Sequence, residues 1–154
     1  MKVSEAMTRN VEIIDPSQPI QQAAQRMCDM DVGSLPVGEN DRLVGMITDR
    51  DIAVRAVAMG KQPSTPVRDI MTADVCYCFE DEDVASVADN MADEQIRRLP
   101  VLNRAKRLVG ILALGDLAIS EDGSGELRKV GEALAGISQP GGAHSQVQDR
   151  RDSL

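Results

Sequence analysis

Aromatic residues, histidine and long apolar runs are scarce in this chain. Tyr77 and Phe79 are its only aromatic residues, so the core has to be aliphatic, and base stacking on aromatic platforms is disfavoured. The single histidine, His144, lies in a polar tail, which leaves the folded body without an imidazole for catalysis. No stretch approaches the roughly 18 apolar residues of a membrane span, and the N-terminus lacks a signal-peptide pattern. We therefore expect a cytoplasmic protein that does not bind a membrane.

Positive charge and metal-binding patterns are also lacking. The formal charge of −8 repels phosphate backbones, so nucleic acid is excluded as an expected partner. Cys28, Cys76 and Cys78 have no zinc-ligand spacing, and we interpret them as small hydrophobic residues of a core in a reducing compartment. No glycine-rich phosphate loop or nucleophile elbow occurs. These absences predict a protein that is not an enzyme and holds no metal.

The sequence contains two copies of one pattern. When Val3 is placed on Val67, Met7-Thr8 falls on Met71-Thr72. The alignment continues through Leu-Pro-Val at 35–37 and 99–101 and, after one inserted residue, through Leu-Val-Gly at 43–45 and 108–110. A repeat of about 60 residues buries only about 60% of its unfolded surface. We therefore expect the copies to pack together.

Both copies predict the same elements. A short strand at about 11–14 precedes a helix, in which Ile20, Ala23, Ala24 and Met27 share one face. Two apolar runs separated by a polar turn then predict a hairpin, and a last helix runs from about Asp51 to Met59, ended by Gly60. The second copy repeats these signals, with Asp81, Glu82 and Asp83 at the start of its first helix and Asp116 near the start of its last.

The repeated pattern of Met-Thr, Leu-Pro-Val and Leu-Val-Gly-x-x-Thr-x-x-Asp resembles the CBS domain, and the two-repeat layout is similar to the stand-alone bacterial group that includes hypoxic response proteins. The resemblance implies an α+β fold of two β-α-β-β-α repeats, packed through their sheets as a pseudo-symmetric pair, and a homodimer made through the helices. The expected divisions are repeat 1 at 1–62, repeat 2 at 63–120, a short C-terminal helix at 121–138 and a flexible tail at 139–154.

Thr48 and Asp51 stand where the second hairpin strand gives way to a helix. Backbone N–H groups are unpaired at such a position, and the helix dipole favours anions there. The resemblance implies that Asp51 accepts hydrogen bonds from ribose hydroxyls, whereas Thr48 and Arg50 reach a phosphate. The spacing also fits a capping box, in which the two side chains serve only the helix. The second copy keeps Asp116 but has Ala113 in place of the threonine.

A cationic cluster lies around the second Leu-Pro-Val. By the same resemblance Arg98 and Arg97 contact a phosphate in a cleft between the repeats, where a guanidinium binds bidentately. The equivalent residues of the first copy are Gly33 and Ser34, so the two clefts cannot be equivalent. The neighbouring Arg104, Lys106 and Arg107 are interpreted as a solvated turn.

Adenine recognition in the CBS family uses strand backbone and apolar walls. The resemblance therefore proposes as candidates Val11, Ile13, Val37, Val75, Tyr77 and Val101. Apolar strand residues are more often core than ligand walls.

The function that these observations favour is a regulatory module. It would bind an adenine nucleotide (AMP, ADP or ATP, with S-adenosylmethionine or NAD as further candidates) in the cleft between the repeats and signal to an unknown regulated protein. No obligatory cofactor is expected. The alternative is a structural dimerisation module without ligand.

Overall fold

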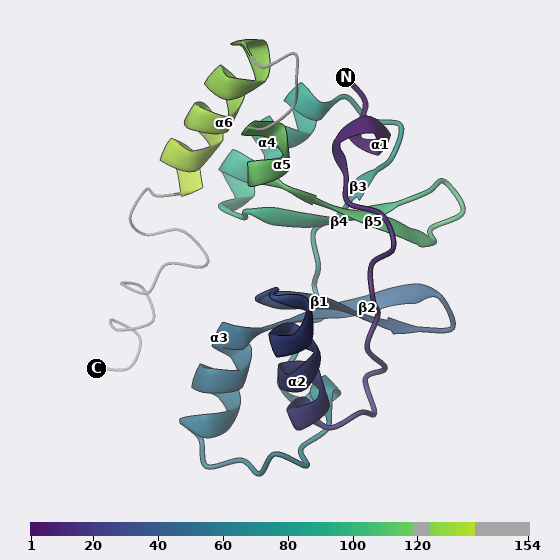
Figure 1. The fold of residues 1–154 in the computed structure, drawn as a ribbon, viewed down its shortest axis with the longest axis vertical. Helices are drawn as coiled ribbons and strands as arrows, with labels where there is room; N and C mark the ends of the chain where they lie inside the picture. Colours follow the sequence, from purple (N-terminus) through teal and green to yellow (C-terminus); the bar gives the residue numbers. More distant parts are fainter. Residues whose placement is uncertain (119–123, 138–154) are drawn as a thin grey trace. The chain divides into compact units, whose positions relative to one another are not determined.

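The computed structural model describes residues 1–118 and 124–137, which form two compact units (Figure 1). The first-repeat unit contains Val11–Cys76 and Lys106–Leu108. The second-repeat unit contains Met1–Asn10, Tyr77–Ala105 and the described residues from Val109 onward. The units are therefore not continuous in sequence: residues 1–10 pack with the second repeat, whereas residues 66–76 pack with the first.

The first-repeat unit is built on one antiparallel hairpin. β1 (Ser34–Glu39) pairs with β2 (Arg42–Thr48), with a bulge between Val37 and Gly38. The turn residues Asn40 and Asp41 have φ of 54° and 62°, as a two-residue hairpin of right-handed twist requires. α2 (Ile20–Met30) precedes the hairpin, and α3 (Asp49–Asp51) follows it, continuing as the π-helix η1 (Ile52–Val57). The 3-10 turn η2 (Val67–Asp69) lies near the end of the Val11–Cys76 segment.

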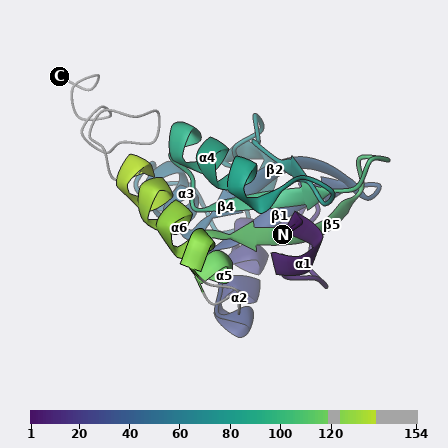
Figure 2. The same cartoon turned by 90° about the horizontal axis from the view of Figure 1, so that it is seen from above.

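The second-repeat unit has a three-stranded sheet in the order β3-β4-β5. β3 (Cys78–Phe79) runs parallel to β4 (Arg98–Leu102), which pairs with β5 (Leu108–Ala113). The helices of this unit are α1 (Val3–Ala6), α4 (Val84–Glu94), α5 (Leu114–Ala118) and α6 (Ser124–Ile137). α4 and α6 lie side by side in both views (Figures 1 and 2).

The apolar spacing read from the sequence is confirmed in both units except at Ala24, which was expected on the same face and is exposed. Ile20, Ala23 and Met27 of α2 face the first core with Ile14, Leu35, Val37 and Ile47. Val84, Val87, Ala88 and Met91 of α4 face the second core with Leu99, Val101 and Leu112. Both helices end on a left-handed residue, Asp31 or Gln95. The two repeats thus bury equivalent helix faces against equivalent hairpins.

Each Met-Thr segment pairs with the hairpin of the other repeat, and the two pairings are alike. The Thr8 N–H donates to the Ile111 carbonyl at 2.8 Å, and the Thr72 N–H donates to the Met46 carbonyl at 2.9 Å. The methionine sulfur packs on a glycine: a Cβ at Gly110 would lie 2.7 Å from the Met7 sulfur, and a Cβ at Gly45 would lie 2.7 Å from the Met71 sulfur. Side chains at these glycines would push the segments away from the strands.

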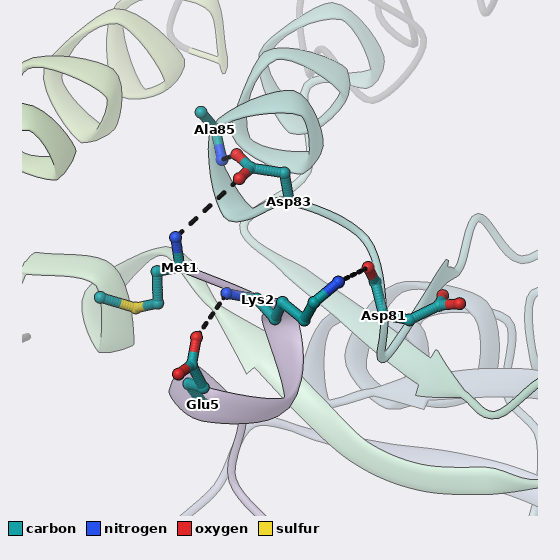
Figure 3. Close-up of polar contacts among 6 residues, drawn as sticks. All are labelled: Met1, Lys2, Glu5, Asp81, Asp83 and Ala85. Atoms are coloured by element: carbon teal, nitrogen blue, oxygen red, sulfur yellow. Dashed lines mark hydrogen bonds and ion pairs between the residues drawn. The ribbon is translucent and has the colours of Figure 1, made fainter.

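The start of the chain is tied to the first turn of α4 (Figure 3). The Met1 α-amino group lies 3.9 Å from Asp83, whose carboxylate caps α4 by accepting the Ala85 N–H at 2.9 Å. The Lys2 Nζ donates to the Asp81 carbonyl at 3.0 Å, and the Lys2 N–H donates to Glu5. Because the contacts with Asp81 and Asp83 join residues distant in sequence, they fix the N-terminal segment to the second repeat.

Three expectations need correction. The strand expected at 11–14 is reduced to a single bridge between Ile14 and Val37. The last helix of the first repeat is a short α3 followed by the π-helix η1, although Gly60, at φ +72°, follows it as expected. Cys28 and Cys76 are exposed, so only Cys78 is a core residue, because the other two side chains point away from the packed faces.

None of the helices within residues 1–118 and 124–137 has the length and apolar character needed to cross a membrane. The tail at 139–154 lies outside the described residues.

Candidate functional site: the strand-to-helix junctions

The junction between β2 and α3 is held by two reciprocal hydrogen bonds. The Asp51 N–H donates to Thr48 Oγ1 at 3.0 Å, and the Thr48 N–H donates to Asp51 Oδ2 at 3.0 Å. This is the capping box that the spacing allowed, and it satisfies two backbone donors that the start of a helix leaves unpaired. The capping role of both residues is therefore confirmed.

Asp51 is the only buried charged residue among the described residues, with 9% of its surface exposed. Its Oδ1 lies 3.6 Å from the Arg55 Nε, one helical turn away. A carboxylate has about four lone-pair sites, and the capping bond uses one of them. Asp51 therefore keeps acceptor capacity for hydroxyl donors that approach the junction. The sequence analysis did not single out Arg55, although the i,i+4 spacing from Asp51 is a detectable signal.

Arg50 projects from the first turn beside this carboxylate. Its side chain is exposed, and its backbone N–H donates to Asp49 Oδ1 at 2.8 Å. The Asp49 N–H in turn donates to the Gly33 carbonyl at 2.9 Å, and a Cβ at Gly33 would lie 3.1 Å from the Asp49 carboxylate. Thr48, Arg50 and Asp51 therefore all lie at this junction, and their role toward a ligand stays a prediction.

The equivalent junction of the second repeat is built differently. Asp116 accepts the Ala113 N–H at 3.0 Å, but Ala113 has no hydroxyl to return the bond. Leu114, which is buried, stands where the first repeat has Asp49, and its N–H donates to the Arg97 carbonyl at 2.9 Å. This junction has one acid and lacks the second acid and the capping hydroxyl of its counterpart.

The arginines around β4 fall into two groups. Arg97 and Arg98 are exposed at the start of β4. Arg104 binds both carboxylate oxygens of Asp81 at 2.9 Å and stacks over the Phe79 ring at 4.1 Å. Arg107 binds Asp41 at 3.1 Å. Arg104 and Arg107 are thus structural surface residues, as the interpretation of this turn expects.

The Arg104 guanidinium holds the pKa of the Asp81 carboxyl below its ordinary value, chiefly through the side-chain hydrogen bond. The same bond raises the pKa of Arg104. Both groups stay charged at neutral pH, and the pair fixes the turn after β4 to the turn before α4.

The apolar candidates do not share one environment. Val37 and Val101 are fully buried in the two cores, so their side chains cannot contact a ligand in this conformation. Val11, Ile13 and Val75 are half-buried. Tyr77 is 43% exposed and meets the Phe79 ring edge to face, with the ring centroids 5.6 Å apart. Of these candidates, only Val11, Ile13, Val75 and Tyr77 have side chains exposed enough to contact a ligand.

The two units define a tandem-repeat protein in which an acid, Asp51 or Asp116, accepts the N–H of the last strand residue at each strand-to-helix junction. The model of the CBS domain matches residues 3–57 and 67–120, so the chain belongs to the CBS domain family. It is 40% identical over 136 residues to the CBS domain-containing protein YhcV of Bacillus subtilis, which covers 88% of this chain and 94% of that one.

Solved structures show the same fold. Hypoxic Response Protein I, crystallised with two coordinated zinc ions, is 32% identical, with a TM-score of 0.70 over 77% of this chain and 97% of that one. The CBS domain pair of protein MJ0100, in complex with 5′-methylthioadenosine and S-adenosyl-L-methionine, is 30% identical, with a TM-score of 0.68 over 77% of this chain and 93% of that one. Within the described part of this chain, no group of three or more His, Cys, Asp or Glu side chains is placed to hold a metal ion.

Proposed function

We propose that this protein is a regulatory module that binds an adenosine-containing ligand at the β2–α3 junction and passes the change to a partner protein. The observation that carries the proposal is Asp51. A carboxylate that is nearly buried, oriented by the Thr48 N–H and still able to accept further bonds is suited to the two adjacent hydroxyls of a ribose. The MJ0100 pair binds two ligands that share an adenosyl group.

The neighbouring residues supply the rest of the recognition. The exposed Arg50 lies in the first turn of this helix, and its guanidinium can bind an anionic phosphate. Ile13 and Val11 are half-buried in the same unit and offer apolar surface for a base. AMP, ADP and ATP fit these groups, whereas S-adenosylmethionine and NAD present the same ribose with other substituents.

Arg97, Arg98, Tyr77 and Asp116 are the corresponding candidates of the second-repeat unit. Asp116 is half-buried, and its junction lacks the hydroxyl of Thr48. We therefore assign the principal site to the first repeat. Since the described residues, 1–118 and 124–137, contain no histidine, we propose that the ligand is bound and not turned over.

A ligand that binds only the native state raises its apparent stability, by about 2.7 kcal/mol at a hundredfold excess over Kd. Thermal unfolding of the purified full chain in the presence of AMP, ADP, ATP, S-adenosylmethionine or NAD therefore tests the proposal. A rise in Tm with at least one of them, confirmed by calorimetry, supports it. No shift with any of the five would favour a structural dimerisation module, in which the capping box is the whole role of Asp51.

A further inference from the structure

The two carboxylate oxygens of Asp51 have different surroundings. Oδ2 accepts the Thr48 N–H at 3.0 Å, which fixes the carboxylate against the end of β2. Oδ1 lies 3.6 Å from the Arg55 Nε, which is longer than an N–H···O hydrogen bond of about 2.7–3.2 Å. The guanidinium therefore attracts Oδ1 without occupying its lone pairs. Asp51 thus has a fixed orientation, a neighbouring positive charge and an oxygen that can still accept hydroxyl donors.

Arg55 has a single polar partner within residues 1–118 and 124–137, and that partner is Asp51. The Arg55 side chain is 56% exposed, and exposed ion pairs at this i,i+4 spacing add little to the stability of a helix. The pair gains importance when a ligand covers the junction, because a carboxylate that leaves water without a counter-ion is strongly disfavoured. The arrangement therefore suits a cation that serves the bound state more than the empty one.

The helix that carries Arg55 is irregular at this point. Arg55 lies on η1, which continues the helix labelled α3 (Figure 1, and from above in Figure 2) and begins directly after Asp51. The Ala58 N–H donates to the Ala53 carbonyl at 2.9 Å, five residues back instead of four. Such π turns are rare and frequently lie at functional sites. The irregular turn therefore starts next to the proposed ribose acceptor.

The second repeat has the acid without the cation. Asp116 accepts the N–H of the last residue of β5, as Asp51 accepts that of the last residue of β2. In the sequence, Ser120 stands where the first repeat has Arg55. The combination of a capping acid and a cation four residues later is therefore specific to the first repeat, which holds the principal proposed site.

We propose that Arg55 is a positioning residue for the ribose at the β2–α3 junction. The role rests on the proposed function, in which Asp51 accepts two ribose hydroxyls. The guanidinium attracts Oδ1 and balances the carboxylate charge once a ligand has displaced water from it. It acts through Asp51 and does not bind the phosphate, which is the role of Arg50. Arg55 therefore affects every ligand with an intact ribose, with or without a phosphate.

The test is calorimetric titration of the full chain with AMP or ATP, whichever binds more tightly, and with adenosine, which has the same ribose and no phosphate. We expect Arg55→Gln to weaken both ligands by a similar factor of about tenfold, because the carboxylate is then covered without a counter-ion. Arg50→Gln should weaken the nucleotide more than adenosine, because it acts on the phosphate. Arg55→Lys should restore most of the affinity, since an ammonium group also balances the acid.

A double-variant cycle checks that Arg55 acts through Asp51. Asp51→Asn keeps a carbonyl oxygen for the hydroxyls and removes the charge. In that background Arg55→Gln should change the affinity for the nucleotide by less than about twofold, because no charge is left to balance. Arg42→Gln is the matched control, because Arg42 is exposed at the other end of β2 and its loss removes the same charge. Without ligand, Arg55→Gln, Arg42→Gln and the natural chain should have nearly the same Tm.

The outcomes separate the role of Arg55 from the proposed function. If AMP, ADP, ATP, S-adenosylmethionine and NAD all fail to bind the natural chain, the proposed function fails and the role of Arg55 fails with it. If the natural chain binds a nucleotide and Arg55→Gln binds it equally well, only the role of Arg55 is overturned. A loss that spares adenosine, or one that persists in the Asp51→Asn background, would mean that Arg55 contacts the phosphate and would also overturn the positioning role.

Discussion

The carboxylate of Asp51 and the hydroxyl of Thr48 each accept the backbone N–H of the other residue, at 3.0 Å in both directions. Asp51, the residue proposed to bind the ligand, is therefore also a capping residue. The second repeat separates the two roles, because Asp116 retains the acid and Ala113 lacks the hydroxyl. Variants at these four positions distinguish a helix cap from a ribose acceptor.

The capping role predicts opposite effects of two threonine/alanine exchanges. Thr48→Ala should lower the free energy of unfolding by about 1 kcal/mol, since the Asp51 N–H loses its acceptor. Ala113→Thr should raise it by a similar or smaller amount, because the new hydroxyl can accept the N–H of Asp116. Urea unfolding of the two variants beside the natural chain measures both. Equal stabilities for all three would contradict the capping role.

The binding role predicts an unequal pair of acid variants. Asp51→Ala should remove most of the affinity for AMP or ATP, whereas Asp116→Ala should remove little, as measured by calorimetry. Loss of a hydrogen bond to a charged group costs about 1.5 to 3 kcal/mol, or about ten- to hundredfold in Kd. Thr48→Ser keeps the hydroxyl and serves as the control that should bind normally. Equal losses from the two acid variants would mean that the junctions are equivalent sites.

The three thiols should differ in reactivity. Burial, with a smaller contribution from the nearby Glu82 carboxylate, raises the pKa of the Cys78 thiol to about 12 from an ordinary value of 9.0. Cys78 should therefore resist alkylation at pH 8 in the native protein, whereas the exposed Cys28 and Cys76 react. Mass spectrometry of peptides after timed labelling distinguishes the three sites. Rapid native labelling of Cys78 would show that this core opens readily.

The raised pKa of Cys78 also predicts a pH dependence of stability. Between the unfolded value near 9.0 and the folded value near 12, the unfolded chain loses a proton that the folded chain keeps. Stability is therefore fully present below pH 9 and falls as the pH rises through this window. Cys78→Ala should have a flatter stability profile above pH 9 than the natural chain, as judged by thermal unfolding. If Cys78→Ala leaves the fall of stability above pH 9 unchanged, ionisation of Cys78 is not its cause.

Docking of α6 predicts a specific effect of Gly136→Leu. A side chain at this position meets the Cβ and carbonyl of Ala92, so α6 must move away from α4. We expect a lower Tm, because the packing of α6 on α4 is weakened. Gly131→Ala is the control, because a Cβ there meets nothing within 4 Å. If the Gly136→Leu variant is as stable as the natural chain, the close contact between Gly136 and Ala92 is dispensable.

The sequence by itself determined the repeat, the two amphipathic helices, the hairpins and the capping box at Thr48 and Asp51. These features depend on hydrogen bonds and apolar spacing within a few residues, which local sequence encodes directly. The family resemblance carried by Leu-Pro-Val and Leu-Val-Gly rests on the same local patterns, and the match of the CBS domain model to both copies confirms it.

Only the tertiary structure decided that residues 1–10 pack with the second repeat and that α6 packs on α4. It also decided that Val37 and Val101 are core residues and that Cys28 is exposed. Contacts such as Lys2 to Asp81 or Gln95 to Gly136 join residues far apart in sequence. Because the two repeats share one local pattern, the choice of which segment packs on which repeat depends on chain connectivity and close packing, which no local pattern contains.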